Sequence, residues 1–261
     1  MVHGRLIILF LLVCFSVQSQ QKIDRFTRFA GESDPILALS PDFYYNNTSI
    51  DTDATIEDDA IDLWEDISGN GDDAVMPNSD NEPRLHLEGA DRQVDGFAND
   101  FLWVDDTSVG EYTLGTDEFS IVIREGESLT DNNGVLVGKG VATSADRLWV
   151  IYRSGSDTNI LVNHGGTATT FTNAVASGNR TIMVVFSTTQ VSCFIDNVEA
   201  GNSPVTLDTS SGDNSSQRMN IFARTDGGFV CDGCQLDLVA GIPSALTSGN
   251  RSDIQDFWGV N

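Results

Sequence analysis

Basic residues are scarce in this 261-residue chain. It contains two lysines, Lys22 and Lys139, and its 14 basic residues are set against 39 acidic ones, for a formal net charge of −25. A surface of this sign repels phosphate backbones and anionic membrane surfaces, so we expect no nucleic-acid partner. The acidic surface favours solubility, and it is also suited to collecting divalent cations.

Several catalytic motifs are missing as well. Three histidines occur in the whole chain, and two of them, His86 and His164, lie beyond the N-terminal segment. No nucleophile elbow, catalytic triad or phosphate-binding loop can be assembled from the sequence. The residue pattern therefore gives no support to nucleophilic or nucleotide-dependent catalysis.

The N-terminus has the pattern of an export signal. Arg5 precedes an apolar run over Leu6–Val17, which is shorter than the roughly 20 residues that a membrane span needs. Val17 and Ser19 occupy positions −3 and −1 of a cleavage point. We predict a signal peptide over 1–19 and a polar lead-in over 20–34; an uncleaved anchor is the competing interpretation. No second anchor segment is present, so we expect a secreted protein without membrane insertion after signal removal.

Three cysteines follow the predicted signal peptide: Cys193, Cys231 and Cys234. Export favours a disulfide, and an odd number leaves one thiol over. Zinc or redox chemistry at Cys231-Asp-Gly-Cys234 is a weaker interpretation, because further zinc ligands lack local spacing and a strand, not a helix, follows the motif. The pattern leaves the pairing open among all three cysteines.

Short strand signals separated by turns dominate the second half of the chain. They are rich in β-branched and aromatic residues, and no helical patterns of 10–15 residues alternate with them, so an all-β sandwich in one domain is indicated. The predicted strands are Phe101–Val104, Phe119–Arg124, Gly134–Gly138, Leu148–Tyr152, Asn159–Val162, Arg180–Phe186, Gln190–Ile195, Met219–Ala223 and Leu236–Ala240.

Two further elements are expected at the ends of this domain. The stretch Pro35–Tyr45 is predicted to be an entry strand from its prolines and aromatics. Ser248–Trp258 is predicted to be a helix, because Ile254, Phe257 and Trp258 recur at i, i+3 and i+4 and Gly259 follows as a stop signal.

One stretch, Asp62–Ala74, specifies its local structure most strongly. Trp64 stands ahead of Asp66 and the turn sequence Ser68-Gly69-Asn70-Gly71, whose glycines allow positive φ and whose Asx side chains can bond to the backbone. Its spacing imitates the opening of a calcium loop, but Pro77 stands where an EF-hand needs a bidentate glutamate. A calcium site made by Asp66 or Asp72 with a remote ligand is the functional alternative to a structural turn.

The order of landmarks resembles the laminin G-like jelly rolls of the concanavalin A-like lectin/glucanase superfamily. The similarity covers about residues 35–261, and two features depart from it: the hairpin turn is Asp196-Asn197 rather than Asn-Gly, and Cys234 enters the last strand. The matching segments are Trp64–Asp66, Ser68–Gly71, Asp73–Ala74, Phe101–Trp103, Phe119–Ile123, Val191–Asn197, Gly233 with Leu236–Val239, Ile242–Leu246 and Phe257–Gly259.

This resemblance implies two antiparallel sheets in a jelly-roll sandwich, with a concave face and rim loops that bind glycans, proteins or calcium in relatives. Some relatives hydrolyse glycosides with paired carboxylates. Here only Glu125 and Glu127 have i, i+2 spacing beside a predicted strand, and Gly126 indicates a turn there. We therefore expect no enzymatic activity, with a hydrolase or lyase as the disfavoured alternative.

Two hypotheses of function follow. The first is an exported recognition module that binds carbohydrate or a cell-surface partner in adhesion, with Trp103 and Trp149 as candidate stacking residues. The second is a structural or decoration protein of an extracellular assembly or virus particle. Trp64 and Trp258 are assigned to packing.

Overall fold

The computed structural model describes residues 33–51, 53–78, 80, 82–88, 91–96, 100–126, 134–140, 147–154, 159–172, 179–210, 217–223, 231 and 233–258. The chain divides into two compact units, Met1–Asp34 and Pro35–Asn261. The predicted signal peptide and almost all of the polar lead-in lie outside the described residues. Within the described residues, no helix has the length and apolar character that crossing a membrane requires.

Nine strands form the first sheet, called sheet A. Its main order is β14-β13-β12-β7-β17-β5-β4, while β1 pairs with β17 and β15 pairs with β13. The strands are β1 (Phe43–Asn46), β4 (Arg84–Glu88), β5 (Asp91–Gly96), β7 (Phe119–Glu125), β12 (Arg180–Phe186), β13 (Gln190–Ile195), β14 (Val198–Glu199), β15 (Val205–Thr206) and β17 (Cys234–Ile242).

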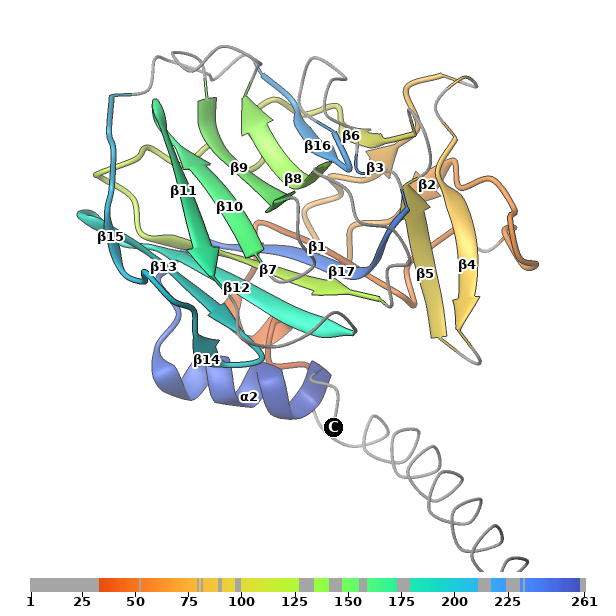
Figure 1. Ribbon diagram of the computed structural model, residues 1–261. Coiled ribbons are helices and arrows are strands. Elements are labelled where there is room, and N and C mark those ends of the chain that lie inside the picture. Colours follow the sequence, from red (N-terminus) through yellow and green to blue (C-terminus); the bar gives the residue numbers. More distant parts are fainter. Residues whose placement is uncertain are drawn as a thin grey trace, which may run out of the picture. The chain divides into compact units, whose positions relative to one another are not determined.

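Eight strands form the second sheet, called sheet B, in the order β11-β10-β9-β8-β16-β6-β3-β2. They are β2 (Leu63–Trp64), β3 (Ala74–Val75), β6 (Leu102–Val104), β8 (Gly134–Gly140), β9 (Arg147–Ser154), β10 (Asn159–His164), β11 (Thr167–Thr172) and β16 (Met219–Ile221). All strand pairs in both sheets are antiparallel. The predicted two-sheet antiparallel sandwich is therefore confirmed (Figure 1).

Both faces of sheet A are buried over its central strands. On β7, Phe119, Ile121 and Ile123 belong to the core between the sheets, whereas Val122 belongs to a second cluster that includes residues of the C-terminal helix. This alternation is the two-residue period of a strand. The helix, α2 (Ser248–Trp258), lies on the side of sheet A opposite to sheet B, as Figure 1 shows.

Aromatic stacking holds the middle of the core. The ring of Phe119 stacks between those of Tyr112 and Phe186, with centroid distances of 4.1 and 4.2 Å. Such offset pairs add to the energy of apolar burial. The core therefore has a continuous aromatic stack where β7 and β12 pair.

One charged group bridges the two sheets inside the sandwich. Glu125 at the end of β7 in sheet A pairs with Arg180 of β12 at 2.5 Å and with Arg153 of β9 in sheet B at 3.4 Å. All three side chains are at most 4% exposed. Glu125 therefore acts as the negative charge that two buried guanidinium groups share.

Nine strands were predicted from the sequence, and all nine exist with bounds that differ by few residues. The helix Ser248–Trp258 has the predicted bounds. The entry strand predicted over Pro35–Tyr45 is wrong in its first half: a 3-10 helix, η1 (Leu37–Leu39), comes first, and the strand begins at Phe43. Ser40 ends η1 with φ 52°, which breaks the extended conformation.

The shared carboxylate gives a test of the core. We expect Glu125→Gln to lower the free energy of unfolding by about 3–5 kcal/mol, because it removes the negative charge that two buried cations share. Chemical denaturation measures this change. Glu118→Gln, at an exposed glutamate just before β7, is the matched control and should change stability by less than about 0.5 kcal/mol; equal effects of both substitutions would contradict the assignment.

Candidate functional site

The turn after Trp64 is organised by one carboxylate. Oδ1 of Asp66 accepts hydrogen bonds from the backbone N–H groups of Tyr44 (2.8 Å) and Ser68 (3.0 Å). Oδ2 accepts from the Ser68 hydroxyl (2.6 Å) and from the N–H groups of Gly71 (3.2 Å) and Asp72 (3.3 Å). Both carboxylate oxygens of Asp66 are therefore engaged in shaping the backbone.

The residues of the predicted structural signature have the expected local roles. Gly69 and Gly71 have φ of 96° and 81°, where glycine is favoured. Asn70 donates its side-chain amide to the carbonyl of Asp42 at 2.8 Å, which ties the turn to the segment before β1. Trp64 is fully buried, and its indole N–H donates to the carbonyl of Asn46 at 2.8 Å.

Calcium at this turn stays a prediction. Burial and the neighbouring carboxylates, Asp106 and Asp66 first among them, raise the pKa of Asp72. Nevertheless, the described residues contain no group of three or more His, Cys, Asp or Glu side chains arranged to hold a metal ion. An ion bound through Asp66 would have to compete with five hydrogen bonds, so the observed geometry favours the structural interpretation of this aspartate.

Trp149 is a core residue, and its prediction as a stacking residue is wrong. Its side chain is fully buried on β9, its indole N–H donates to the carbonyl of Gly110 at 3.0 Å, and its ring lies 6.4 Å from that of Phe119. No ligand can stack on a ring that the protein encloses on all sides. Neighbouring Tyr152 lies on the opposite face of the strand, in a small outer cluster with Val135 and Val150.

Trp103 lies on the outer face of sheet B. Its neighbours on β6, Leu102 and Val104, point into the core, so the alternation of the strand directs Trp103 outward, where it is partly exposed. The guanidinium of Arg218 lies 4.2 Å from the centre of its ring and pairs with Asp105 at 3.2 Å. This set, Trp103, Asp105 and Arg218, is called the Trp103 cluster below.

The Trp103 cluster combines an aromatic face with hydrogen-bonding groups of both kinds. The side chains of Arg218 and Asp105 are 41% and 70% exposed, so both can exchange protein partners for a ligand. A guanidinium supplies donors and a carboxylate supplies acceptors. The sequence singled out Trp103 but gave no sign of Arg218, which reaches the site through the pairing of β16 with β6.

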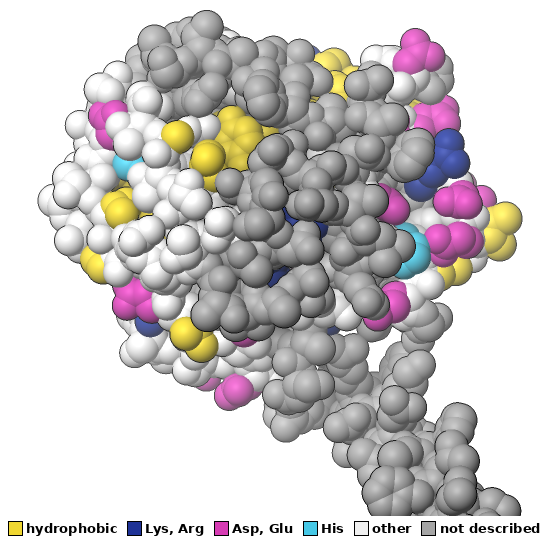
Figure 2. Space-filling view, viewed as in Figure 1, with side chains coloured by type: hydrophobic (Ala, Val, Ile, Leu, Met, Phe, Trp, Pro, Cys, Tyr) yellow, Lys and Arg dark blue, Asp and Glu magenta, His cyan; other side chains and the backbone are white. Residues whose placement is uncertain are grey.

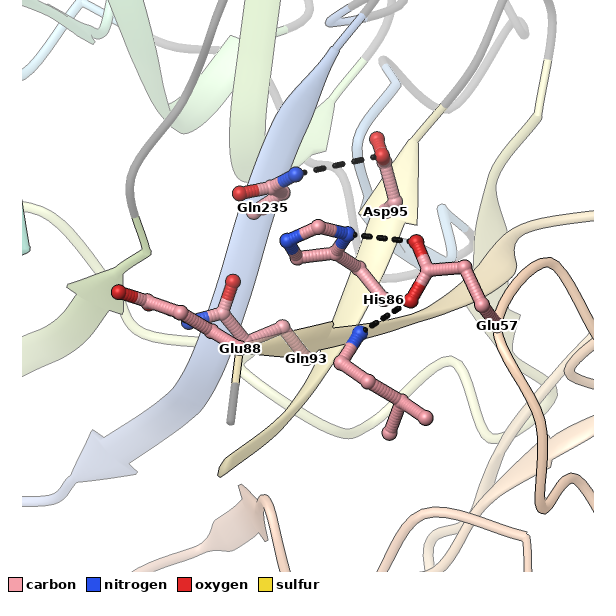
Figure 3. Close-up of polar contacts among 7 residues, drawn as sticks. Glu57, His86, Glu88, Gln93, Asp95 and Gln235 are labelled. Carbon is pink, nitrogen blue, oxygen red and sulfur yellow. Dashed lines mark hydrogen bonds and ion pairs between the residues drawn. The ribbon is translucent and has the colours of Figure 1, made fainter. Parts of the chain in front are cut away.

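A second polar cluster, on β4, β5 and β17, was not predicted. Figure 3 shows the carboxylate of Glu57 beside the ring of His86, with Oε1 2.8 Å from Nδ1. Oε2 of Glu57 accepts the N–H of Leu87 at 2.7 Å. Figure 2 shows acidic side chains and a histidine at this edge of the molecule. Partial burial acts to raise the pKa of Glu57, but these hydrogen bonds outweigh it and lower the pKa.

The same cluster continues along the sheet. Gln93 donates to Glu88 at 3.1 Å, and Gln235 donates to Asp95 at 3.5 Å. The strand β5 has one apolar side chain, Val94, so its sequence lacks the apolar alternation by which a strand is recognised. The strand β4 does alternate, with Leu85 and Leu87 between polar residues, but it has five residues and was not predicted. The cluster becomes visible only once the register of β4, β5 and β17 is known.

Of the three cysteines after the predicted signal peptide, two form a disulfide and one is a free thiol. Cys231 and Cys234 form a disulfide with a Cα–Cα distance of 5.5 Å, and Cys193 is a buried free cysteine. Burial raises the pKa of the Cys193 thiol to about 12, so the thiol is protonated at neutral pH. Of the pairings that the sequence left open, the short one within Cys231-Asp-Gly-Cys234 is the one observed.

Comparison with known proteins gives fold similarity alone. Neither a protein-family model nor a curated protein sequence matches the chain. Trypanosoma rangeli sialidase in complex with sialic acid is similar in structure, with a TM-score of 0.58 and 14% identity over 84% of this chain and 33% of the sialidase. The binding domain of botulinum neurotoxin DC in complex with rat synaptotagmin II has a TM-score of 0.56 and 10% identity over 85% of this chain and 52% of that domain.

The chain thus spans about a third of the sialidase and about half of the toxin domain. The receptor-binding domain of botulinum neurotoxin D gives a similar result, with a TM-score of 0.57 and 11% identity over 84% of this chain and 53% of that domain. One set of neighbours is an enzyme and the other is not. The similarity is consistent with the predicted jelly-roll fold and leaves activity open.

The turn carboxylate is testable by a nearly isosteric change. We expect Asp66→Asn to lower the free energy of unfolding by about 1–3 kcal/mol, because the amide group replaces one acceptor oxygen with a donor that faces N–H groups. Thermal or chemical denaturation measures the loss. Glu65→Gln, at the exposed neighbouring residue, should be nearly neutral, and a neutral Asp66→Asn would show that the turn does not depend on this carboxylate.

Proposed function

We propose that this protein is an exported, non-catalytic recognition module that binds carbohydrate or a cell-surface partner through the outer face of sheet B. The observation that carries the proposal is the Trp103 cluster. A partly exposed indole with a guanidinium over one face of its ring and a carboxylate paired to that guanidinium suits a sugar ring, which offers an apolar C–H face and a rim of hydroxyl groups. Export is proposed from the pattern over residues 1–19.

The charge of the chain narrows the ligand class. At a net charge of −25, the protein repels polyanions at long range, and the guanidinium of Arg218 already pairs with Asp105. A neutral carbohydrate is not repelled, and its hydroxyl groups can form hydrogen bonds with both Arg218 and Asp105. We therefore favour a neutral glycan over a sulfated or phosphorylated one.

The structural neighbours are compatible with this proposal. The sialidase was solved with sialic acid, and one toxin domain with a protein, synaptotagmin II. Sandwiches of this shape therefore occur in proteins that bind glycans and in proteins that bind protein receptors. The finer assignment to laminin G-like domains is part of the proposal, and it rests on the residues of the Asp62–Ala74 stretch and the terminal strand and helix.

The non-catalytic part of the proposal rests on the state of Glu125. This residue is the described member of the carboxylate pair considered for glycoside hydrolysis, and Glu127 lies outside the described residues. Glu125 is 1% exposed and paired with Arg153 and Arg180. A general acid or nucleophile has to reach the substrate, whereas this carboxylate is committed to two buried cations.

A glycan array, read with and without calcium, tests the proposal. We expect the wild-type protein to bind one class of neutral glycans, and we expect Trp103→Ala to lose about two- to tenfold in affinity, since one aromatic contact contributes about 0.5–1.5 kcal/mol. The two buffers also test the calcium prediction at Asp66 and Asp72.

Val198→Ala, at a valine 63% exposed on sheet A, is the matched surface control and should bind as the wild type does. Absence of binding in both buffers would contradict the proposal. Association of the purified protein with particles or assemblies, together with absence of binding, would favour the structural or decoration role instead.

A further inference from the structure

A buried histidine holds the segment that passes from one sheet to the other. Residues 207–210 follow β15 of sheet A and lead toward β16 of sheet B. The N–H of Leu207 donates to the carbonyl of Thr189 at 2.9 Å, and the N–H of Asp208 donates to Nδ1 of His164 at 2.9 Å. This stretch is called the 207–210 segment below.

The same segment packs closely on the β10–β11 hairpin. The Thr167 hydroxyl donates to Oδ2 of Asp208 at 2.7 Å. A Cβ added to Gly165, which has φ 58°, would lie 2.6 Å from the Asp208 carbonyl oxygen. The hairpin turn therefore leaves no space for a side chain under the segment, and its hold on the segment consists of two hydrogen bonds and this close contact.

The hydrogen bond to His164 fixes the protonation state of the ring. A backbone N–H is only a donor, so Nδ1 of His164 must be the acceptor and its proton must be on Nε2. Nε2 lies 3.1 Å from the Thr169 hydroxyl, which can accept that proton. The ring is fully buried. A proton added to Nδ1 would place two N–H groups against each other.

The groups around the ring are few in the described part of the chain. Asp208 is the charged group that acts on His164, and its carboxylate favours the protonated ring. The pairing partners of His164 are Trp149 on β9 and Thr167 on β11, which do not titrate near neutral pH, and Lys139 lies beyond Trp149 on β8. Burial outweighs the carboxylate and lowers the pKa of His164.

We propose that His164 is a pH-sensitive switch that releases the 207–210 segment from the β10–β11 hairpin under acid conditions. The neutral ring accepts the Asp208 N–H and holds the segment, whereas the protonated ring cannot accept it. Since the folded state favours the neutral ring, this contribution to stability is present above about pH 6.5 and is lost as the pH falls below the ordinary pKa of histidine. This inference does not depend on the proposed recognition function.

Hydrogen exchange of the full chain, read by NMR or mass spectrometry between pH 7.5 and 5, tests the proposal. After correction for the pH dependence of chemical exchange, we expect protection of the Asp208 N–H to fall about tenfold for each pH unit below about 6.5. Protection in α2 should not change over the same range. Retained protection of the Asp208 N–H at pH 5 would overturn the proposal.

Two variants distinguish release caused by protonation of His164 from a general loss of stability at acid pH. His164→Asn places an amide oxygen near the position of Nδ1 and removes the titration, so it should keep the segment protected at pH 5. His86→Asn is the control at the other described histidine, which lies on β4 of sheet A, and it should leave the wild-type pH dependence unchanged. Equal pH dependence in wild type and His164→Asn would overturn the proposal.

The wild-type protein itself provides a measurement that no substitution can disturb. Ring ¹⁵N shifts of His164 at pH 7.5 should show the neutral tautomer with its proton on Nε2. A proton on Nδ1, or a charged ring at this pH, would contradict the proposed switch even if His164→Asn fails to fold.

Discussion

The carboxylate of Asp66 is the constraint on which the join between the two sheets depends. It accepts the N–H of Tyr44, which belongs to β1 of sheet A, and it shapes the turn that connects β2 and β3 of sheet B. Within the same corner, the N–H of Ile67 donates to the Tyr44 carbonyl at 2.9 Å, and the Trp64 indole donates to Asn46. A single acidic residue thus accepts hydrogen bonds from backbone N–H groups of both sheets, at the edge of the hydrophobic core.

Much of this architecture could be predicted because short segments of the sequence determine the strands, the turns and the helix. The strand Phe119–Glu125 directs Phe119, Ile121 and Ile123 into the core and Val122 to the opposite face. The turn at Asp196 and Asn197 has the positive φ of 49° and 61° that Asx residues tolerate. The strand β5 was missed because Val94 is its one apolar side chain, and β4 was missed although Leu85 and Leu87 alternate there with polar residues. Their place in sheet A is decided by the pairing of β5 with β17, a tertiary contact that no local pattern contains, and β4 joins the sheet through β5.

The candidate site was predictable only in part, for a related reason. Trp103 and Trp149 look alike in the sequence, as single tryptophans in short apolar strands. Which of the two faces solvent depends on whether its position in the strand points into the core or away from it. Trp149 points into the core and donates to the Gly110 carbonyl, whereas Trp103 points outward and lies beside Arg218. The contribution of Arg218 to the site follows from the register of β16 on β6, and that of Glu57 to the cluster at His86 follows from a turn that packs against β4; both join residues far apart in the chain.

The proposed recognition function requires that Trp103 is the tryptophan that solvent can reach on the outer face of sheet B. The most direct measurement is the relaxation that a soluble paramagnetic agent causes in the indole signals of the intact protein, with Trp103→Phe used for assignment. We predict strong relaxation of the Trp103 signals and weak relaxation of those of Trp64 and Trp149, which are fully buried. Relaxation of Trp149 as strong as that of Trp103, or a protected Trp103, would contradict the account.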